Sequence, residues 1–369
     1  MTRIKKVFIE EAAQSHAMTG RIISMLQKRS TGQPLAGEEY PTTPLDKEAL
    51  RLVSFPGEFL KPCPGTKSYI CCGYQILNAG TQCPLDCSYC ILQSYFDQPD
   101  MKIFVNLENK LEEIGAHLDK TADKLFRIGT GEFMDSLALD PYAGWSAFLP
   151  GFIHKRRNAV LEFKTKTDRV EGLLSSKTKD RIIVSWSLNS PSIAAREEHG
   201  APPVRKRLTA AKACQDAGFA IGFHFDPIIQ HLNWKEQYVK TLEMMEGIID
   251  PSRVVWISLG CLRFMPNLKS VVLRRHKDTR ILDGEFIPGL DGKMRYFKPI
   301  RIELYNFIKQ QLDAWHKDLG LYLCMESDEV WNKAMGWSPE NSEGLSRYLD
   351  QRALKFFPEL RGLASKSAQ

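Results

Sequence analysis

The chain has 369 residues, of which 43% are hydrophobic and 25% are charged, and its formal net charge is +6. This composition is typical of a globular protein with a large core. The mild positive charge is compatible with a nucleic-acid partner without requiring one. No apolar run of about 18 residues occurs, and the first residues lack a signal-peptide core, so no membrane span or secretion signal is expected. The nine cysteines are clustered, which favours metal binding over disulfides and predicts a reduced, cytoplasmic protein.

Short runs with strand-like composition alternate with stretches of helical period from about residue 71. The strands expected from these runs cover residues 73–78, 124–129, 160–164, 181–188, 219–225 and 253–259. The clearest helices between them are expected at 107–120, 203–217 and 234–249. Six βα units in series predict a parallel sheet with right-handed crossovers. The expected fold is therefore an α/β partial (β/α)6 TIM-like barrel, with its active site at the C-terminal ends of the strands.

Three regions are expected along the chain: an N-terminal extension at 1–70, the barrel at 71–262 and a C-terminal segment at 263–369. The extension contains a candidate helix at 12–28. The C-terminal segment begins with a basic, glycine-containing stretch at 265–298, which is interpreted as a loop or hairpin. An amphipathic helix at 301–319 and a further strand at 322–325 are expected to complete the substrate side.

The cysteine motif carries the strongest functional signal. Cys83, Cys87 and Cys90 have the spacing C-x3-C-x2-C, just after the first expected strand. Three thiolates on one loop can hold a [4Fe-4S] cluster and leave one iron open for a ligand. A structural zinc site needs a fourth ligand, which Cys71 or Cys72 could supply, but the spacing is not the paired C-x2-C of zinc ribbons.

This motif, placed between the first two of six βα units, resembles the radical S-adenosylmethionine superfamily. Tyr89, just before the last cysteine, matches the aromatic residue that lies near adenine in that superfamily, and it is a candidate catalytic residue too. Gly131 and Glu132, after the second strand, resemble the element that binds the methionine amino group. Lys164, at the end of the third strand, is the candidate partner of the methionine carboxylate. Taken singly, Glu132 could be a helix N-terminal carboxylate and Lys164 a solvated strand end.

The wider pattern resembles the spore photoproduct lyase family over about residues 65–330. The strings that carry this resemblance are the stretch Cys83–Gln93, Lys164-Thr-Lys166, the run from Val184 to Ser190, Arg205-Lys-Arg207 and the run from Gly218 to Ile229. The resemblance implies reductive cleavage of S-adenosylmethionine, hydrogen abstraction from a pyrimidine-dimer photoproduct in DNA, and a reductant such as flavodoxin or ferredoxin. Ser187 and Asn189 end the fourth strand and are candidates to bind the ribose hydroxyls or the methionine carboxylate, although as plain structure they would be turn formers. Phe225, on the fifth strand, is a further cofactor-binding candidate.

The chain departs from this family at two positions. The hydrogen-donor cysteine that the family carries after the second strand is absent, because residues 129–136 contain no cysteine. The family tyrosine that follows the last cluster cysteine is replaced by Ile91. Cys261, at the end of the sixth strand, is the candidate catalytic thiol that could replace the donor. A buried small hydrophobe is the plainer interpretation of Cys261 and of Cys324.

Basic and aromatic residues are interleaved after the sixth strand. Arg263, Lys293, Arg295 and Tyr296 are the candidates for substrate binding, since cations with aromatics suit phosphate contacts and base stacking. A solvated loop explains the same pattern. The leading hypothesis is a radical enzyme acting on DNA or a nucleotide, in DNA repair. A radical enzyme with another nucleotide or small-molecule substrate and a non-catalytic iron-sulfur, nucleic-acid-binding protein are the alternatives.

Overall fold

The computed structural model describes residues 4–28, 34–35, 47–66 and 68–363. Its centre is an eight-stranded sheet in the order β16-β12-β11-β10-β9-β8-β5-β4. The strands are β4 (Leu60–Pro62), β5 (Gln75–Leu77), β8 (Phe126–Gly129), β9 (Ala159–Thr165), β10 (Ile182–Ser187), β11 (Ala220–Ile228), β12 (Val254–Cys261) and β16 (Leu321–Leu323). All neighbours pair in parallel except β4 and β5. The six expected strands are β5 and β8 to β12, so the partial barrel is confirmed.

The strand expected at 322–325 is also present, as β16, and it extends the parallel sheet beyond the sixth unit. The sheet curls until its two margins approach each other. An isolated antiparallel bridge then joins Ile70, ahead of β5, to Glu326, after β16. The amide of Ile70 donates to the carbonyl oxygen of Glu326 at 2.9 Å. This contact spans the gap of an otherwise open barrel.

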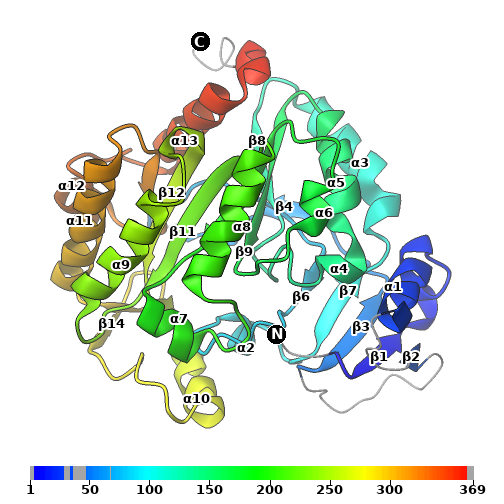
Figure 1. Cartoon of the computed structure of the whole chain (residues 1–369), viewed down its shortest axis with the longest axis horizontal. Helices are drawn as coiled ribbons and strands as arrows, with labels where there is room; N and C mark the ends of the chain where they lie inside the picture. The colour runs from blue at the N-terminus through cyan, green and yellow to red at the C-terminus, as the bar shows by residue number, and fades with distance from the viewer. Residues whose placement is uncertain (1–3, 29–33, 36–46, 67, 364–369) are drawn as a thin grey trace.

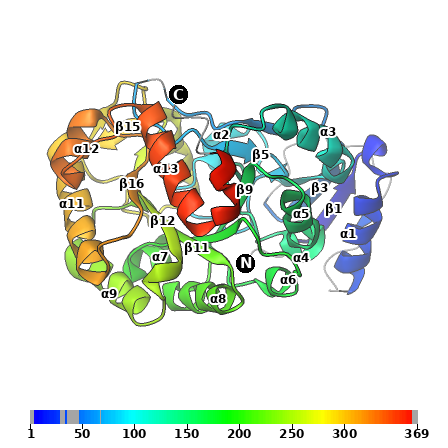
Figure 2. The same cartoon turned by 90° about the horizontal axis from the view of Figure 1, so that it is seen from above.

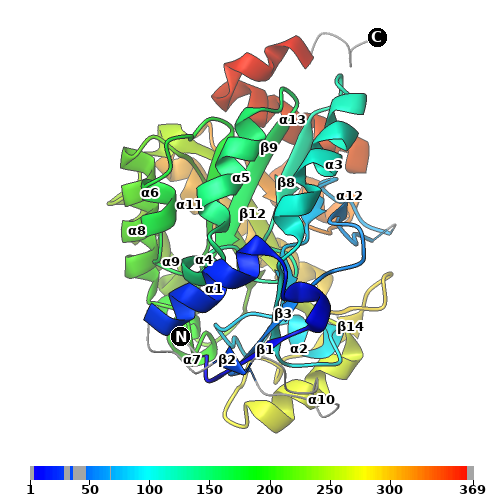
Figure 3. The same ribbon diagram turned by 90° about the vertical axis from the view of Figure 1, so that its right-hand side faces the viewer.

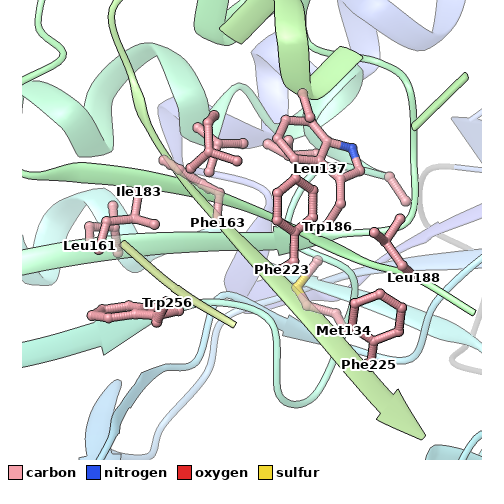
Figure 4. Close-up of a cluster of buried hydrophobic side chains, with 14 of the residues drawn as sticks. Met134, Leu137, Leu161, Phe163, Ile183, Trp186, Leu188, Phe223, Phe225 and Trp256 are labelled. Atoms are coloured by element: carbon pink, nitrogen blue, oxygen red, sulfur yellow. The ribbon is translucent and has the colours of Figure 1, made fainter. Parts of the chain in front are cut away.

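Helices cover the outer surface of the sheet (Figures 1 and 2). They are α3 (Leu107–Lys120), α4 (Asp140–Ala143), α5 (Trp145–His154), α6 (Glu171–Leu174), α7 (Pro191–Glu197), α8 (Val204–Asp216), α9 (Trp234–Glu246) and α11 (Lys298–Trp315). Alternation along the strands explains the core, because every second side chain faces these helices. Phe163, Trp186 and Phe223, from three successive strands, gather beside Leu137, as Figure 4 shows.

A second, smaller sheet lies at the N-terminal side of the molecule, and sequence patterns did not predict it. Its order is β2-β1-β3-β7-β6. The strands are β1 (Lys6–Ile9), β2 (Pro34–Leu35), β3 (Ala49–Val53), β6 (Gly80–Thr81) and β7 (Met101–Phe104). The expected N-terminal helix is present as α1 (Ala17–Lys28), and short turns are present at η1 (Glu11–Ala13) and α2 (Leu92–Tyr95). Since β6 precedes the three cysteines directly, this sheet anchors the start of their loop.

The segment at 265–298, expected to be a loop or hairpin, contains a hairpin, and it also contains a helix that the sequence patterns did not predict. It contains α10 (Pro266–Arg275) and an antiparallel sheet of β13 (Arg263–Phe264), β15 (Met294–Tyr296) and β14 (Phe286–Pro288). Proline at the first turn and apolar residues at helical spacing explain α10, with Leu268 and Val272 buried. The basic residues between these apolar positions made the segment look like a loop in the sequence.

The two ends of the barrel carry different elements. Figures 1 and 3 place α13 (Ser342–Phe356) at one end and α10 at the other. Arg352 of α13 donates to the carbonyl oxygen of Val255 at 3.0 Å, at the start of β12, so α13 covers the N-terminal ends of the strands. The C-terminal ends lie on the side of α10. The remaining short elements are η2 (Pro251–Arg253), α12 (Asp328–Met335) and η3 (Pro358–Leu363).

The three-part division of the chain stays a proposal, because both expected boundaries are crossed by sheets. Strand β7 pairs with the N-terminal strand β3, and β16 pairs with β12. No described helix is long and apolar enough to cross a bilayer.

Candidate active site

The three cysteines lie on one loop between β6 and α2, at residues 82–91, which we call the cysteine loop. Cys87 is buried, Cys83 and Cys90 are partly exposed, and none of them forms a disulfide. The Gln93 side chain donates to the carbonyl oxygens of Cys87 and Cys90 at 3.1 and 3.3 Å. These hydrogen bonds from a nearby side chain stabilise the backbone turns of the cysteine loop.

Helix α7 holds the cysteine loop from one side. Cys87 and Glu198 form an isolated antiparallel bridge, and the amide of Ser88 donates to the Glu197 carbonyl oxygen at 2.8 Å. The Ser88 hydroxyl donates to the Glu197 carboxylate, and the Tyr89 hydroxyl donates to the Glu198 carboxylate. Two consecutive glutamates thus fix the backbone and side chains of the loop around Cys87.

A buried ion pair supports this contact. Glu198 and Arg207 of α8 have fully buried side chains in direct contact. Arg207 also donates to the carbonyl oxygens of Pro202 at 2.8 Å and Ser187 at 3.1 Å. Burial raises the pKa of Glu198, but the positive charges of Arg207 and Lys166 outweigh it and hold that pKa below its usual range. A stable carboxylate therefore accepts the Tyr89 hydroxyl beside the cysteine loop.

Helix α10 and an N-terminal lysine hold the loop from the other side. Asp86 accepts from Arg275 at 2.8 Å and contacts Lys47 at 2.5 Å. Arg275 also donates to the Gln93 side chain. Burial raises the pKa of Asp86, but Lys47 and Arg275 lower it to about 2. Part of the basic segment thus binds the cysteine loop itself.

The three cysteine thiols are ligands of the kind that iron–sulfur clusters take from proteins. Burial raises the pKa of Cys83, and it raises the pKa of Cys87 to about 12. Such thiols stay protonated unless a metal stabilises the thiolates. The amide nitrogen of Leu85 lies 3.5 Å from Cys83 Sγ, a contact of the kind that tunes cluster sulfurs. Within the described residues, no three His, Cys, Asp or Glu side chains are placed to hold a single metal ion.

The candidate methionine-binding residues lie together where β8 and β9 end. A Cβ added to Gly131 would stand 2.8 Å from Lys164 Cβ, so the glycine allows the two segments to approach. The side chains of Glu132 and Lys164 interact electrostatically, yet within the described part of the chain neither forms a hydrogen bond or ion pair. Burial lowers the pKa of Lys164, but Glu132, Asp226 and Glu162 raise it above its usual range. The Glu132 carboxylate and the Lys164 ammonium lie near each other without direct contact. A zwitterionic ligand placed between them would present an opposite charge to each.

Hydrogen bonds of Asp135 and Ser136 connect the loop after β8 to the end of β9. Asp135 accepts from the amides of Leu137 and Lys166 at 3.0 and 2.7 Å. Ser136 Oγ accepts from the amide of Lys164 at 3.0 Å, and its own amide donates to the Lys164 carbonyl oxygen at 3.1 Å. The loop after β8 is therefore tied to β9, which fixes the spacing of Glu132 and Lys164.

The other cofactor candidates have different surroundings. Tyr89 is buried, with Lys166 Nζ 5.6 Å from its ring centre. Ser187 shares the inward face of β10 with Ser185 and is buried. Asn189 accepts from Tyr238 at 2.7 Å and donates to the Pro227 carbonyl oxygen at 3.1 Å, so its amide joins the ends of two strands. Phe225 is fully buried near Tyr238.

A buried polar network lies deeper in the barrel, and the sequence analysis missed it. Glu162 Oε1 accepts from His224 at 2.9 Å, from Trp256 at 2.8 Å and from Ser185. Burial raises the pKa of Glu162, but His224, Ser185 and Trp256 lower it to about 2. These residues come from four neighbouring strands, and only inward alternation on each strand could have indicated them.

The candidate substrate residues are mostly engaged in internal contacts. Arg295 is buried, with its guanidinium 4.1 Å from the ring centre of Tyr69 and 2.7 Å from Asp291. Lys293 contacts the same aspartate at 3.5 Å. Tyr296 is buried and accepts from the amide of Gln230 at 3.2 Å. Their role in substrate binding stays a prediction.

The side chains of Arg263 and Cys261 lie in different surroundings although the two residues are close in sequence. Arg263 binds Asp226 with two contacts at 3.1 and 3.2 Å at the C-terminal end of the barrel. Cys261 is buried, and its amide donates to the Tyr305 hydroxyl at 2.8 Å. On β12 it follows the outward alternation of Ile257 and Leu259, toward α11. Its catalytic role also stays a prediction.

Fold and site together define a class. A partial parallel barrel with three free cysteines on a loop at its active-site end, beside a glycine-opened carboxylate, is the architecture of radical S-adenosylmethionine enzymes. Comparisons with known proteins narrow this class further.

A sequence model described as spore photoproduct lyase matches residues 67–309. The chain is 26% identical over 239 residues to the spore photoproduct lyase of a Geobacillus species, covering 63% of this chain and 67% of that one. It is 22% identical over 217 residues to the enzyme of Clostridium acetobutylicum, covering 58% and 62%. It is 25% identical over 234 residues to that of Bacillus subtilis, covering 63% and 66%. The matches thus span about two thirds or less of these relatives.

Solved structures share the fold. A spore photoproduct lyase complexed with dinucleoside spore photoproduct superposes with a TM-score of 0.76 at 20% identity, over 87% of this chain and 99% of that one. A double mutant with bound S-adenosylmethionine and the same dinucleoside gives 0.76 at 19% identity, over 89% and 100%. This chain belongs to the spore photoproduct lyase family, as its sequence resemblance indicated.

Proposed function

We propose that this protein cleaves S-adenosylmethionine reductively and uses the resulting radical to abstract hydrogen from a pyrimidine-dimer photoproduct in DNA. The observation that carries the proposal is the position of the cysteine loop, clamped by α7 and α10 at the same end of the barrel as Glu132 and Lys164. When bound to Cys83, Cys87 and Cys90, a [4Fe-4S] cluster supplies the electron for this cleavage.

The residues of this chain then have separate tasks. Glu132 accepts hydrogen bonds from the methionine ammonium, and the Lys164 ammonium pairs with the methionine carboxylate. The raised pKa of Lys164 keeps its charge in a buried place, which the second contact needs. The α7 clamp and the Glu198–Arg207 pair fix the cysteine loop, so the reacting groups keep their distance.

The substrate class is proposed from the relatives and from surface charge. The solved relatives bind a dinucleoside spore photoproduct. In this chain Lys269, Arg274 and Lys277 are exposed on or just after α10. They form no ion pair within the described ranges, so their charges are available to phosphates. Helix α10 rather than the β14–β15 hairpin is therefore the proposed contact with the nucleic-acid backbone.

A repair assay tests the proposal. The protein, reconstituted with iron and sulfide without oxygen, is reduced and incubated with S-adenosylmethionine and dinucleoside spore photoproduct. Formation of thymidine from the dinucleoside together with 5′-deoxyadenosine is the expected result. Cys87→Ala serves as the control without a cluster. Formation of 5′-deoxyadenosine without any repaired dinucleoside would refute the lyase activity and retain the radical chemistry.

One observation favours a second candidate, a radical enzyme with another nucleotide or small-molecule substrate. The loop after β8, residues 130–139, carries no thiol. Binding of ultraviolet-irradiated DNA with a steep salt dependence would contradict a small-molecule substrate. A non-catalytic iron-sulfur protein gains support only if the loaded protein forms no 5′-deoxyadenosine. A cytoplasmic location and a flavodoxin or ferredoxin as electron donor remain predictions.

A further inference from the structure

A thiol outside the cysteine loop lies at the active-site end of the barrel. Cys324 directly follows β16, and its amide donates to the carbonyl oxygen of Leu259 at 3.0 Å. It continues the face of Tyr322, whose neighbour Ser258 lies on the inward face of β12. Cys324 is partly exposed, so this side chain reaches the open end of the barrel rather than the helical layer.

Charged residues hold this thiol in place. Arg263 Nη2 donates to Cys324 Sγ at 3.5 Å while the same guanidinium binds Asp226. A Cβ added to Gly260 would stand 2.7 Å from Asp226 Oδ1 and 2.8 Å from Arg263 Nη1, so the glycine makes room for this pair. Lys164 interacts electrostatically with both Asp226 and Cys324. The candidate methionine site and the thiol therefore share one space.

Cys261 and Cys214 are buried, unlike Cys324, and they differ from it in their surroundings. Cys261 lies toward α11, near Tyr305 and Glu326. Cys214 lies in α8, and burial alone raises the pKa of its thiol to about 12. Burial also raises the pKa of Cys324, although Arg263 opposes it, so this thiol keeps its hydrogen. Cys324 thus combines a protonated sulfur with a place beside the reacting groups.

We propose that Cys324 is the residue from which a carbon radical in the barrel regains a hydrogen atom. This inference rests on the proposed radical function. The S–H bond of Cys324 breaks homolytically, a C–H bond forms on the radical, and the unpaired electron moves to sulfur. The S–H bond is a suitable source because it is weaker than the aliphatic C–H and alcohol O–H bonds around it. A small-molecule thiol then returns a hydrogen atom to Cys324, and two of the resulting thiyl radicals combine as its disulfide.

Solvent deuterium tests the proposal without a known substrate. In D2O the Cys324 thiol becomes S–D, so a 5′-deoxyadenosyl radical formed without substrate takes up deuterium. The loaded, reduced holoenzyme is incubated with S-adenosylmethionine and dithiothreitol, and mass spectrometry measures both the amount and the deuterium content of 5′-deoxyadenosine. Cys324→Ala is compared with Cys214→Ala, which removes the same thiol from α8. We expect loss of deuterium only in Cys324→Ala, with 5′-deoxyadenosine still formed.

The outcomes separate this proposal from the proposed function. Unlabelled 5′-deoxyadenosine from the unaltered protein in D2O would overturn the role of Cys324. This measurement uses no variant, so misfolding of a variant does not affect it. Full labelling in Cys324→Ala, or loss of label in Cys261→Ala instead, would overturn it too. In each of these cases the proposed cofactor cleavage survives. Absence of 5′-deoxyadenosine altogether would refute the proposed function, and the inference with it.

Discussion

Removing one member of the Glu198–Arg207 pair should destabilise the protein strongly. In Arg207→Met the Glu198 carboxylate keeps the Tyr89 hydroxyl and Lys166 but loses the larger of the two charges that hold its pKa down. Both side chains are fully buried, so the remaining carboxylate stands in a medium that solvates it poorly. Breaking such a pair costs about 3 to 5 kcal/mol of unfolding free energy. The carbonyl oxygens of Pro202 and Ser187 also lose their donors.

Urea unfolding of the metal-free protein, followed by circular dichroism, measures this loss. The exposed pair of Arg347 and Glu343, at 2.8 Å on α13, provides the matched control, because Arg347→Met should cost less than about 1 kcal/mol. The double variant Arg207→Met with Glu198→Gln should lose less than the sum of the single variants, since the two residues are coupled. Purely additive losses, or a loss in Arg207→Met as small as in the control, would refute the reasoning. Iron retention should fall with stability in Arg207→Met, because Glu198 also bridges to Cys87.

Three further results are expected. Cys87→Ala should abolish both iron binding and 5′-deoxyadenosine formation, measured by iron analysis and chromatography, and a variant that keeps its iron would contradict the assignment. Gly131→Ala should lower the unfolding free energy by about 1 to 3 kcal/mol and weaken S-adenosylmethionine binding, because its Cβ meets Lys164, whereas Gly151→Ala, with open space around it, should not destabilise the protein. Stability should fall as the pH drops from 4.5 toward 2, since the folded state lowers the pKa of Glu162 from 4.5 to about 2. This pKa shift contributes about 3 kcal/mol to the unfolding free energy. Urea unfolding at each pH should show that Glu162→Gln loses less unfolding free energy over that range than the unaltered protein. An equal loss in both would mean that another group causes the acid sensitivity.

The barrel could be predicted because each of its strands has a local signal. Buried parallel strands are short apolar runs, and three of the six, at 124–129, 219–225 and 253–259, directly follow a helix of clear period. The second sheet lacks that signal. Strands β1, β3 and β7 are separated by long connections, and β7 follows the cysteine loop, so no hairpin or βα unit indicates their pairing.

Much of the candidate site depends on contacts between distant segments. The spacing of Cys83, Cys87 and Cys90 is visible in the sequence, but their clamp uses Glu198 and Arg275, which no pattern links to them. Arg275 belongs to a basic stretch that also suits phosphate binding, and only packing separates the two roles. Whether a cysteine side chain at a strand end points into the barrel or toward the helices depends on the strand register, which composition does not reveal.

The bridge between Ile70 and Glu326 has a consequence for synthesis of the chain. A nascent polypeptide that has emerged only through β12 has all six strands of the βα units, yet the margin of its sheet beside β12 lacks β16. Translation at about 5 to 20 residues per second leaves that margin unpaired for some seconds. Unpaired strand edges invite association with other chains, so this interval is when a chaperone would be most useful.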